Sequence, residues 1–175
     1  HQNPGEHLLF FGRIHPDKGT AHAIEVARRC GRRLDIAGII QDQEYFRDAV
    51  APHLDGDQVR YLGAVDADSR TEVLGGAHAL LHLIDFDEPF GYSVVESMAC
   101  GTPVIAHARG SMGELIEHGV TGYLAADMDA AVAAVDAAGG LDRAKIAECA
   151  AARFSVSAMV DKYVDVYRDV LGARA

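Results

Sequence analysis

Basic residues are scarce in this sequence: 16 lysines and arginines stand against 26 aspartates and glutamates, which gives a formal net charge of −10. Proteins that bind nucleic acids or anionic membranes normally carry an excess of basic charge on the binding surface. The composition therefore disfavours both as partners. Any anion site must be built locally, from a few cations.

Cysteine is equally rare. Cys30, Cys100 and Cys149 are odd in number, widely spaced and embedded in helical patterns, which disfavours a disulfide framework or a zinc motif. We interpret them as buried free thiols in a reducing compartment. No apolar run approaches the roughly 18 residues that a membrane-spanning helix needs, and no segment reads as a signal peptide or lipidation motif. We expect a soluble, cytoplasmic protein.

Two common nucleotide-binding signatures are also missing. The first strand is followed by neither a Walker-type loop nor a Gly-x-Gly-x-x-Gly turn, so a P-loop enzyme and an NAD-binding domain both lose their main support. The loop that is present, "GRIHPDKG" (12–19), places Arg13 and Lys18 on one rim. A guanidinium and an ammonium together suit a diphosphate. These residues alone are equally compatible with two solvated surface charges.

Short apolar runs alternate with helical patterns along most of the chain. Strands that are apolar throughout and alternate with helices are typical of a parallel sheet covered on both faces. We therefore predict a Rossmann-like α/β fold with about six strands. The predicted strands are 7–12, 33–38, 59–63, 79–84, 103–107 and 121–125; the predicted helices are 20–30, 44–54 (interrupted by Pro52), 69–77, 91–100, 112–119, 127–138, 142–153 and 157–171.

The segment after the fourth predicted strand carries two acids, Glu88 and Glu96, with seven residues between them. Gly91 begins the intervening helix, whose first backbone N–H groups form a natural phosphate site. Glu96 would suit the vicinal hydroxyls of a ribose, and Glu88 those of a sugar. On spacing alone, Glu88 could instead be an acid favoured by the helix dipole and Glu96 a solvated helix residue. We interpret His82, in the fourth strand, as a packed strand residue.

Three stretches together carry a resemblance to a known family. "GRIHPDKG", "EPFGYSVVESMACGTPVIA" (88–106) and "GVTGYL" (119–124) resemble the C-terminal half of family-four retaining glycosyltransferases of the GT-B fold, the glycosyl transferases group 1. The resemblance covers nearly the whole chain. Two departures are Tyr92, where an aliphatic residue is commoner, and the missing proline at the end of the fourth strand.

The resemblance implies roles for individual residues. Arg13 and Lys18 would stabilise the leaving nucleoside diphosphate of a UDP-, GDP- or ADP-sugar, and Glu88 would complete the catalytic set by holding the donor sugar. Glu96 would accept from the ribose hydroxyls. No metal and no tightly bound cofactor is expected. The implied donor-binding residues are Gly12, Arg13, Lys18, Gly38, Ile39, Arg60, Leu62, Val65, Glu88, Phe90, Gly91, Tyr92 and Glu96.

The same resemblance implies an incomplete enzyme. Residues 1–156 would form the nucleotide-sugar-binding domain, and the amphipathic helix in 157–175 would cross to an N-terminal, acceptor-binding domain that the sequence lacks. We expect the chain alone to bind donor without turnover. Two alternative functions stay open: a nucleotide-binding or assembly module that kept the fold without catalysis, and a GT-B-type epimerase or phosphorylase. Without a partner domain, the C-terminal helix would cover its apolar stripe by packing on this domain or in a homodimer.

Overall fold

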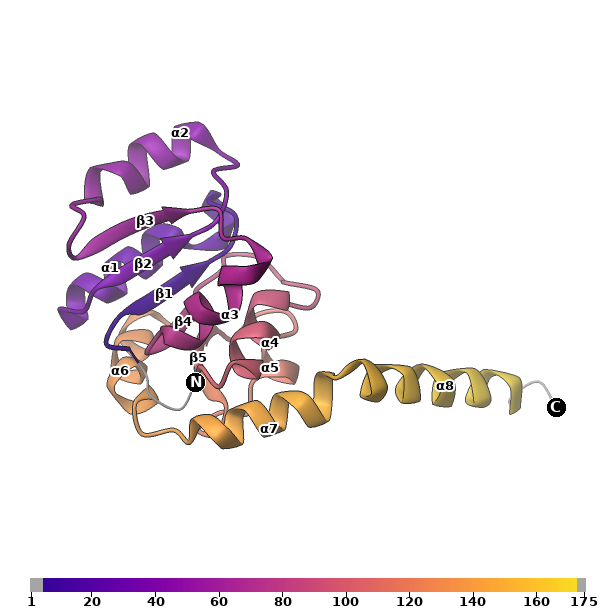
Figure 1. The fold of residues 1–175 in the computed structure, drawn as a ribbon. Coiled ribbons are helices and arrows are strands. Elements are labelled where there is room, and N and C mark those ends of the chain that lie inside the picture. The colour runs from indigo at the N-terminus through magenta and orange to yellow at the C-terminus, as the bar shows by residue number, and fades with distance from the viewer. Residues whose placement is uncertain (1–4, 173–175) are drawn as a thin grey trace.

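A computed structural model describes residues 5–172 as one six-stranded parallel sheet with helices on both faces (Figure 1). The strand order is β3-β2-β1-β4-β5-β6, so the chain starts in the middle of the sheet, winds to one edge and then crosses to the other. The predicted fold class and all six strands are confirmed. The strands are β1 (Leu8–Phe11), β2 (Leu34–Ala37), β3 (Val59–Gly63), β4 (Ala79–His82), β5 (Val104–His107) and β6 (Gly122–Ala125).

The central strands are buried because both faces of the sheet are covered. Leu8 pairs in register with Leu34 on one side and Ala79 on the other, and every residue of β2 and β4 is buried. The order reverses between β1 and β4. In open parallel sheets, ligands bind beyond the carboxyl ends of the strands at such a point.

The helices divide between the two faces. Buried residues of α1 (Thr20–Cys30) and α6 (Met128–Ala138) join one apolar core. Residues of α3 (Ala67–Gly76), α4 (Tyr92–Ala99), α5 (Met112–Leu115) and α7 (Arg143–Phe154) join the other. Aspartates cap α3, α6 and α7, each accepting a hydrogen bond from a backbone N–H of the first turn, which satisfies donors that the helix itself leaves free.

The last helix, α8 (Val156–Gly172), projects away from the sheet domain as a continuation of α7 (Figure 1). None of its residues is buried, and its large apolar side chains are exposed. Within residues 5–172, no helix combines the length and apolar character required to cross a membrane. The predicted binding domain (1–156) and the predicted crossing helix (157–175) include residues 1–4 and 173–175, which lie outside the described range.

Three expectations need correction. The helix predicted over 44–54 is an α-helical turn, α2 (Gln43–Tyr45), then a π-helical turn (Phe46–Val50) and a 3₁₀ turn (Ala51–His53), because Pro52 cannot continue an α-helix. The helix predicted over 112–119 ends at Leu115. The turn that follows is stabilised by a hydrogen bond from the Glu117 N–H to the Thr121 hydroxyl.

The cysteines are free, as expected, but only partly buried.

Candidate functional site

An open cavity of about 370 Å³ lies where the strand order reverses, between the carboxyl ends of β1 and β4 and the start of α4. We call it the switch-point cavity. Seven of the predicted site residues line it together: Gly12, Arg13, Lys18, Glu88, Gly91, Tyr92 and Glu96. Five residues that the sequence did not single out as ligands complete the lining: Phe10, Phe11, Arg70, His82 and Ser93.

Lys18 and Glu88 form an ion pair inside this cavity. The Lys18 Nζ lies 2.6 Å from Glu88 Oε2, and the two side chains are only 14% and 16% exposed. The ammonium also lies 4.3 Å from the centre of the Phe86 ring, a favourable cation–π arrangement. Glu88 and Phe86, both in the loop after β4, therefore hold the Lys18 ammonium in place. The N–H groups of the ammonium that do not bond to Glu88 can donate to a ligand.

The position of Lys18 depends on Gly19. Lys18 ends a 3₁₀ turn (Pro16–Lys18), and Gly19 follows with φ +73°. A Cβ on Gly19 would lie 1.9 Å from the Leu83 carbonyl oxygen, so no other residue fits this approach of the two loops. The Asp85 N–H donates to the Asp17 carbonyl at 2.9 Å, which ties the same loops together a second time.

Arg13 lines the cavity from the loop after β1 but does not contact Glu88. Its guanidinium donates to the side-chain carbonyl of Gln41, which follows β2. Gln41 thus orients one of the two predicted diphosphate ligands. No local motif marks Gln41, because it lies 28 positions from Arg13 in the chain.

Glu96 is also paired, with a residue that no motif in the sequence marks. Arg70 of α3 donates from Nη1 to Glu96 Oε1 at 2.9 Å. Arg70 Nε is buried and has no hydrogen-bond partner in the described part of the chain. Arg70 therefore orients the Glu96 carboxylate and keeps a further donor inside the site.

The start of α4 is built around Gly91, whose φ of +93° favours glycine. A Cβ there would lie 2.8 Å from the Met112 side chain. Beside it, the Ser111 hydroxyl donates to the Phe90 carbonyl at 2.7 Å, and the Ser111 N–H donates to the Glu88 carbonyl at 3.0 Å. The loop after β5 thus fixes the backbone that carries Glu88. Tyr92 is 76% exposed at the rim.

The remaining predicted donor residues lie outside the cavity lining. Arg60 forms two hydrogen bonds with the buried Asp35, of 2.8 and 2.6 Å, so its side chain is committed to the sheet. Ile39 and Leu62 are exposed. The other residues in this set are Gly38, Val65 and Phe90, and of these Gly38 packs so closely on Gly12 that a Cβ would overlap its carbonyl.

His82 is a buried wall of the cavity and is only 7% exposed. Burial lowers the pKa of its imidazole from 6.5 to about 4, so the ring is neutral at physiological pH. Its Nε2 has no hydrogen-bond partner among residues 5–172. The packing prediction holds, but an unpartnered buried nitrogen on a cavity wall also offers a polar contact to a ligand.

Among residues 5–172, no group of three or more side chains of metal-binding type converges in this cavity. In residues 5–172, three side chains of metal-binding type come close together only at His22, Asp85 and His107. Of these, Asp85 and His107 line a second cavity, together with residues from the start of α6.

Comparisons with known proteins agree on one family. Residues 2–139 match the family described as Glycosyl transferases group 1. The glycogen synthase of Mycobacterium tuberculosis is 34% identical over 135 residues, which are 71% of this chain and 31% of that protein. The D-inositol 3-phosphate glycosyltransferase of Mycobacterium marinum is 32% identical over 182 residues, 94% of this chain and 38% of that protein.

Solved structures agree with the fold. A glycosyltransferase involved in avilamycin A biosynthesis superposes with a TM-score of 0.80 at 28% identity, over 98% of this chain and 53% of that one. Anabaena HepE, solved in complex with UDP-glucose, superposes with a TM-score of 0.81 at 21% identity, over 94% and 49%. The chain thus spans about a third of the length of the curated relatives it matches and about half of these solved chains.

Proposed function

The chain belongs to the glycosyl transferases group 1 family, and from that premise we propose that it is the donor-binding half of a retaining glycosyltransferase. The complete enzyme would transfer a sugar from a nucleoside-diphosphate sugar to an acceptor hydroxyl. The observation that carries the proposal is the convergence of Arg13, Lys18, Glu88 and Glu96 on the switch-point cavity. They come from segments that are distant in sequence and meet only in the folded chain.

Arg13 and Lys18 bind the diphosphate in this proposal. As the bond from the sugar to the diphosphate breaks, negative charge grows on the departing phosphate oxygens. Two cations held in place by Gln41 and Glu88 can stabilise that charge without rearranging, and this fixed electrostatic stabilisation is the main catalytic contribution of this half.

The acids select the hydroxyls. Glu88 accepts from the donor sugar, and Glu96, oriented by Arg70, accepts from the ribose. The first turn of α4, with Gly91 and Ser93 at the cavity, directs its backbone N–H groups toward the phosphates. His82, neutral and buried, offers Nε2 to the ligand in the same space.

The structure of HepE with UDP-glucose supports a UDP-sugar as the first donor to test. The base would lie against backbone and apolar groups, which do not distinguish one base from another. These groups belong to Gly38, Ile39, Leu62 and Val65. GDP- and ADP-sugars are therefore tested as donors beside the UDP-sugar. The proposal includes no metal and no tightly bound cofactor in the donor cavity.

The acceptor side of the enzyme is proposed to lie on an N-terminal domain outside this sequence. The exposed apolar side chains of α8, among them Met159, Tyr163, Tyr167 and Leu171, would cover part of that domain, with a homodimer through α8 as the competing arrangement. Residues 1–156 would then form the binding domain and 157–175 the crossing helix. We propose a cytoplasmic location, which the partly buried free cysteines support.

A thermal-shift panel of UDP, GDP, ADP, TDP and uridine on this chain tests the proposal. Ligand at about 100 times its Kd adds about 2.7 kcal/mol of stability, which shifts the unfolding midpoint measurably. We expect one diphosphate to raise the midpoint and uridine to leave it unchanged. If no diphosphate raises the midpoint, the donor-binding proposal fails for this chain. That result would favour the alternative, a module that kept the fold without catalysis.

A further inference from the structure

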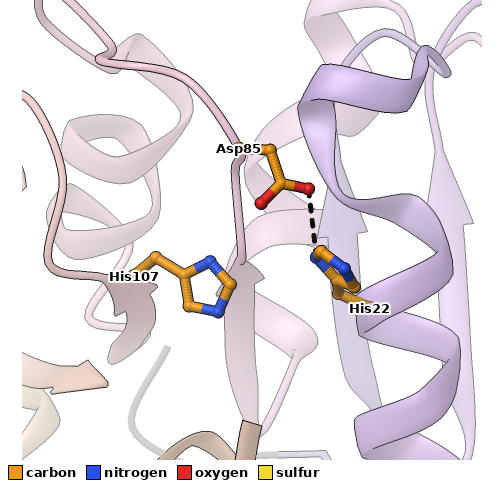
Figure 2. A group of neighbouring side chains, drawn as sticks. All are labelled: His22, Asp85 and His107. Atoms are coloured by element: carbon orange, nitrogen blue, oxygen red, sulfur yellow. Dashed lines mark ion pairs between the residues drawn. The ribbon is translucent and has the colours of Figure 1, made fainter. Parts of the chain in front are cut away.

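Three metal-binding side chains from separate parts of the fold converge beside the donor loops. Figure 2 shows His22 on α1, Asp85 just after β4 and His107 at the end of β5, with both rings directed toward the carboxylate. One ligand atom from each residue lies within 4.8 Å of the other two. We call them the imidazole–carboxylate cluster. The donor-site proposal uses none of them.

The hydrogen bonds of both rings suit metal binding. His22 Nδ1 lies 3.2 Å from the Leu83 carbonyl oxygen, and His107 Nδ1 lies 3.1 Å from the Ile84 carbonyl oxygen. A carbonyl only accepts hydrogen bonds, so each neutral ring carries its proton on Nδ1 and keeps a free lone pair on Nε2. Metal-binding histidines in proteins usually donate their other ring nitrogen to a backbone carbonyl or carboxylate in this way.

Asp85 has the freedom to complete the site. Its carboxylate oxygens lie 3.6 Å from His22 Nδ1 and 3.8 Å from Arg109 Nη1, and the side chain is 49% exposed. Ligand bonds of about 2.0–2.2 Å around zinc bring neighbouring ligand atoms to roughly 3.5 Å of one another. The His22 nitrogen that faces Asp85 is Nδ1, which also bonds to the Leu83 carbonyl. Binding through Nε2 therefore requires the His22 ring to turn toward the carboxylate, together with a closure of about 1 Å.

We propose that the imidazole–carboxylate cluster binds a first-row divalent cation of the Zn²⁺ type. Two imidazoles and one carboxylate favour zinc and its neighbours over Mg²⁺ or Ca²⁺, which prefer all-oxygen sites. Three protein ligands leave a coordination position open. Two of the three residues, Asp85 and His107, also line a cavity of about 600 Å³ with Arg109 and Asp127, where an anionic ligand could complete the coordination.

A cation at this point would act on the donor loops. Asp85 lies three residues before Glu88, and its N–H bonds to the Asp17 carbonyl next to Lys18. Linking Asp85 to α1 and β5 would therefore restrain the loop that carries Glu88, the partner of Lys18. The inference does not depend on donor binding, because its test uses the metal alone.

Isothermal titration of the chelator-treated chain with Zn²⁺ and with Mg²⁺ tests the site. We expect one Zn²⁺ per chain, no measurable Mg²⁺ binding at the same concentrations, and a loss of about 100-fold or more in Zn²⁺ affinity in H22A and in H107A. His53→Ala is the matched control: it removes a half-buried histidine on the far edge of the fold and should bind Zn²⁺ like the parent.

Co²⁺ provides a second readout that does not depend on the alanine variants folding. Its visible absorption reports the ligand set, and Asp85→Asn, at a partly exposed loop position, should change that spectrum and weaken binding. Unchanged Zn²⁺ affinity in the H22A/H107A double variant would overturn the proposal. So would equal affinity for Mg²⁺, or no Zn²⁺ binding by the parent chain.

Discussion

Lys18 and Glu88, 70 positions apart in the sequence, lie with Nζ and Oε2 only 2.6 Å apart on the wall of the switch-point cavity. The pair joins the loop after β1 to the loop after β4. The ammonium and the carboxylate neutralise each other although both side chains are largely shielded from solvent. This pairing allows a proposed phosphate ligand, Lys18, and a proposed sugar ligand, Glu88, to lie in the same cavity. A bound diphosphate would share the ammonium with Glu88, so binding and the position of Glu88 are coupled.

The first prediction concerns the two cations. Lys18→Ala and Arg13→Ala should each weaken nucleoside-diphosphate binding by about 1.5–3 kcal/mol, the usual loss for a hydrogen bond to a charged group. Binding of the bare nucleoside should change little, because it carries no phosphate. Titration calorimetry of both ligands on each variant measures the difference. A parent chain that binds nucleoside and diphosphate equally well would refute the diphosphate assignment.

The second prediction concerns Glu96 and Arg70. Glu96→Gln should reduce affinity for a ribonucleotide more than for its 2′-deoxy analogue, since the carboxylate is proposed to accept from the ribose hydroxyls. Arg70→Ala should reduce the same preference, because Arg70 orients that carboxylate at 2.9 Å. The ratio of the two dissociation constants is the readout. A preference for the ribonucleotide that survives both substitutions would place the ribose elsewhere.

The third prediction separates backbone strain from a local effect on Glu88. Gly110 and Gly119 both adopt positive φ, +53° and +79°, but only a Cβ on Gly110 would meet the Glu88 backbone, at 2.5 Å. G119A should lose about 1–2 kcal/mol of stability from strain alone, and G110A should lose more, because its Cβ also overlaps the Glu88 backbone. G110A alone should also bind a UDP-sugar more weakly relative to UDP. Identical ligand profiles for the two variants would show that Gly110 does not position Glu88.

The fourth prediction follows from the lowered pKa of His82, about 4 in the folded chain against 6.5 for the ordinary ring. The unfolded chain takes up this proton first, so stability should fall as the pH drops from about 6.5 to about 4, by roughly 3 kcal/mol at most. Burial also lowers the pKa of His7 and adds a smaller effect of the same sign. Above about pH 7 both rings are neutral in either state, and the dependence ends.

Urea unfolding of the parent chain and of H82N between pH 4.5 and 7.5 measures this. H82N should show a flatter profile over the window, and H7N should lose only a minor part of the slope. Equal slopes for H82N and the parent would mean that His82 is not the group responsible.

Local sequence was sufficient for the six strands and for a set of candidate site residues. Apolar runs of strand length alternating with helical patterns predicted the six parallel strands. The residues after β1 and around Gly91 marked two candidate cations and two candidate acids, and these four side chains line one cavity. Local patterns failed where a tertiary or backbone constraint decided, as at Pro52, which breaks the predicted helix into three short turns.

What the sequence determined was which chemistry-bearing residues follow which strand; what only the tertiary structure decided was which of them meet. The strand order β3-β2-β1-β4-β5-β6 makes β1 and β4 neighbours, and this brings Lys18 to Glu88. It also sets Arg70 against Glu96 and leaves His82 Nε2 unpartnered on the cavity wall. The same order assembles His22, Asp85 and His107. These contacts depend on long crossover connections, and no spacing within a single segment encodes where such a connection ends.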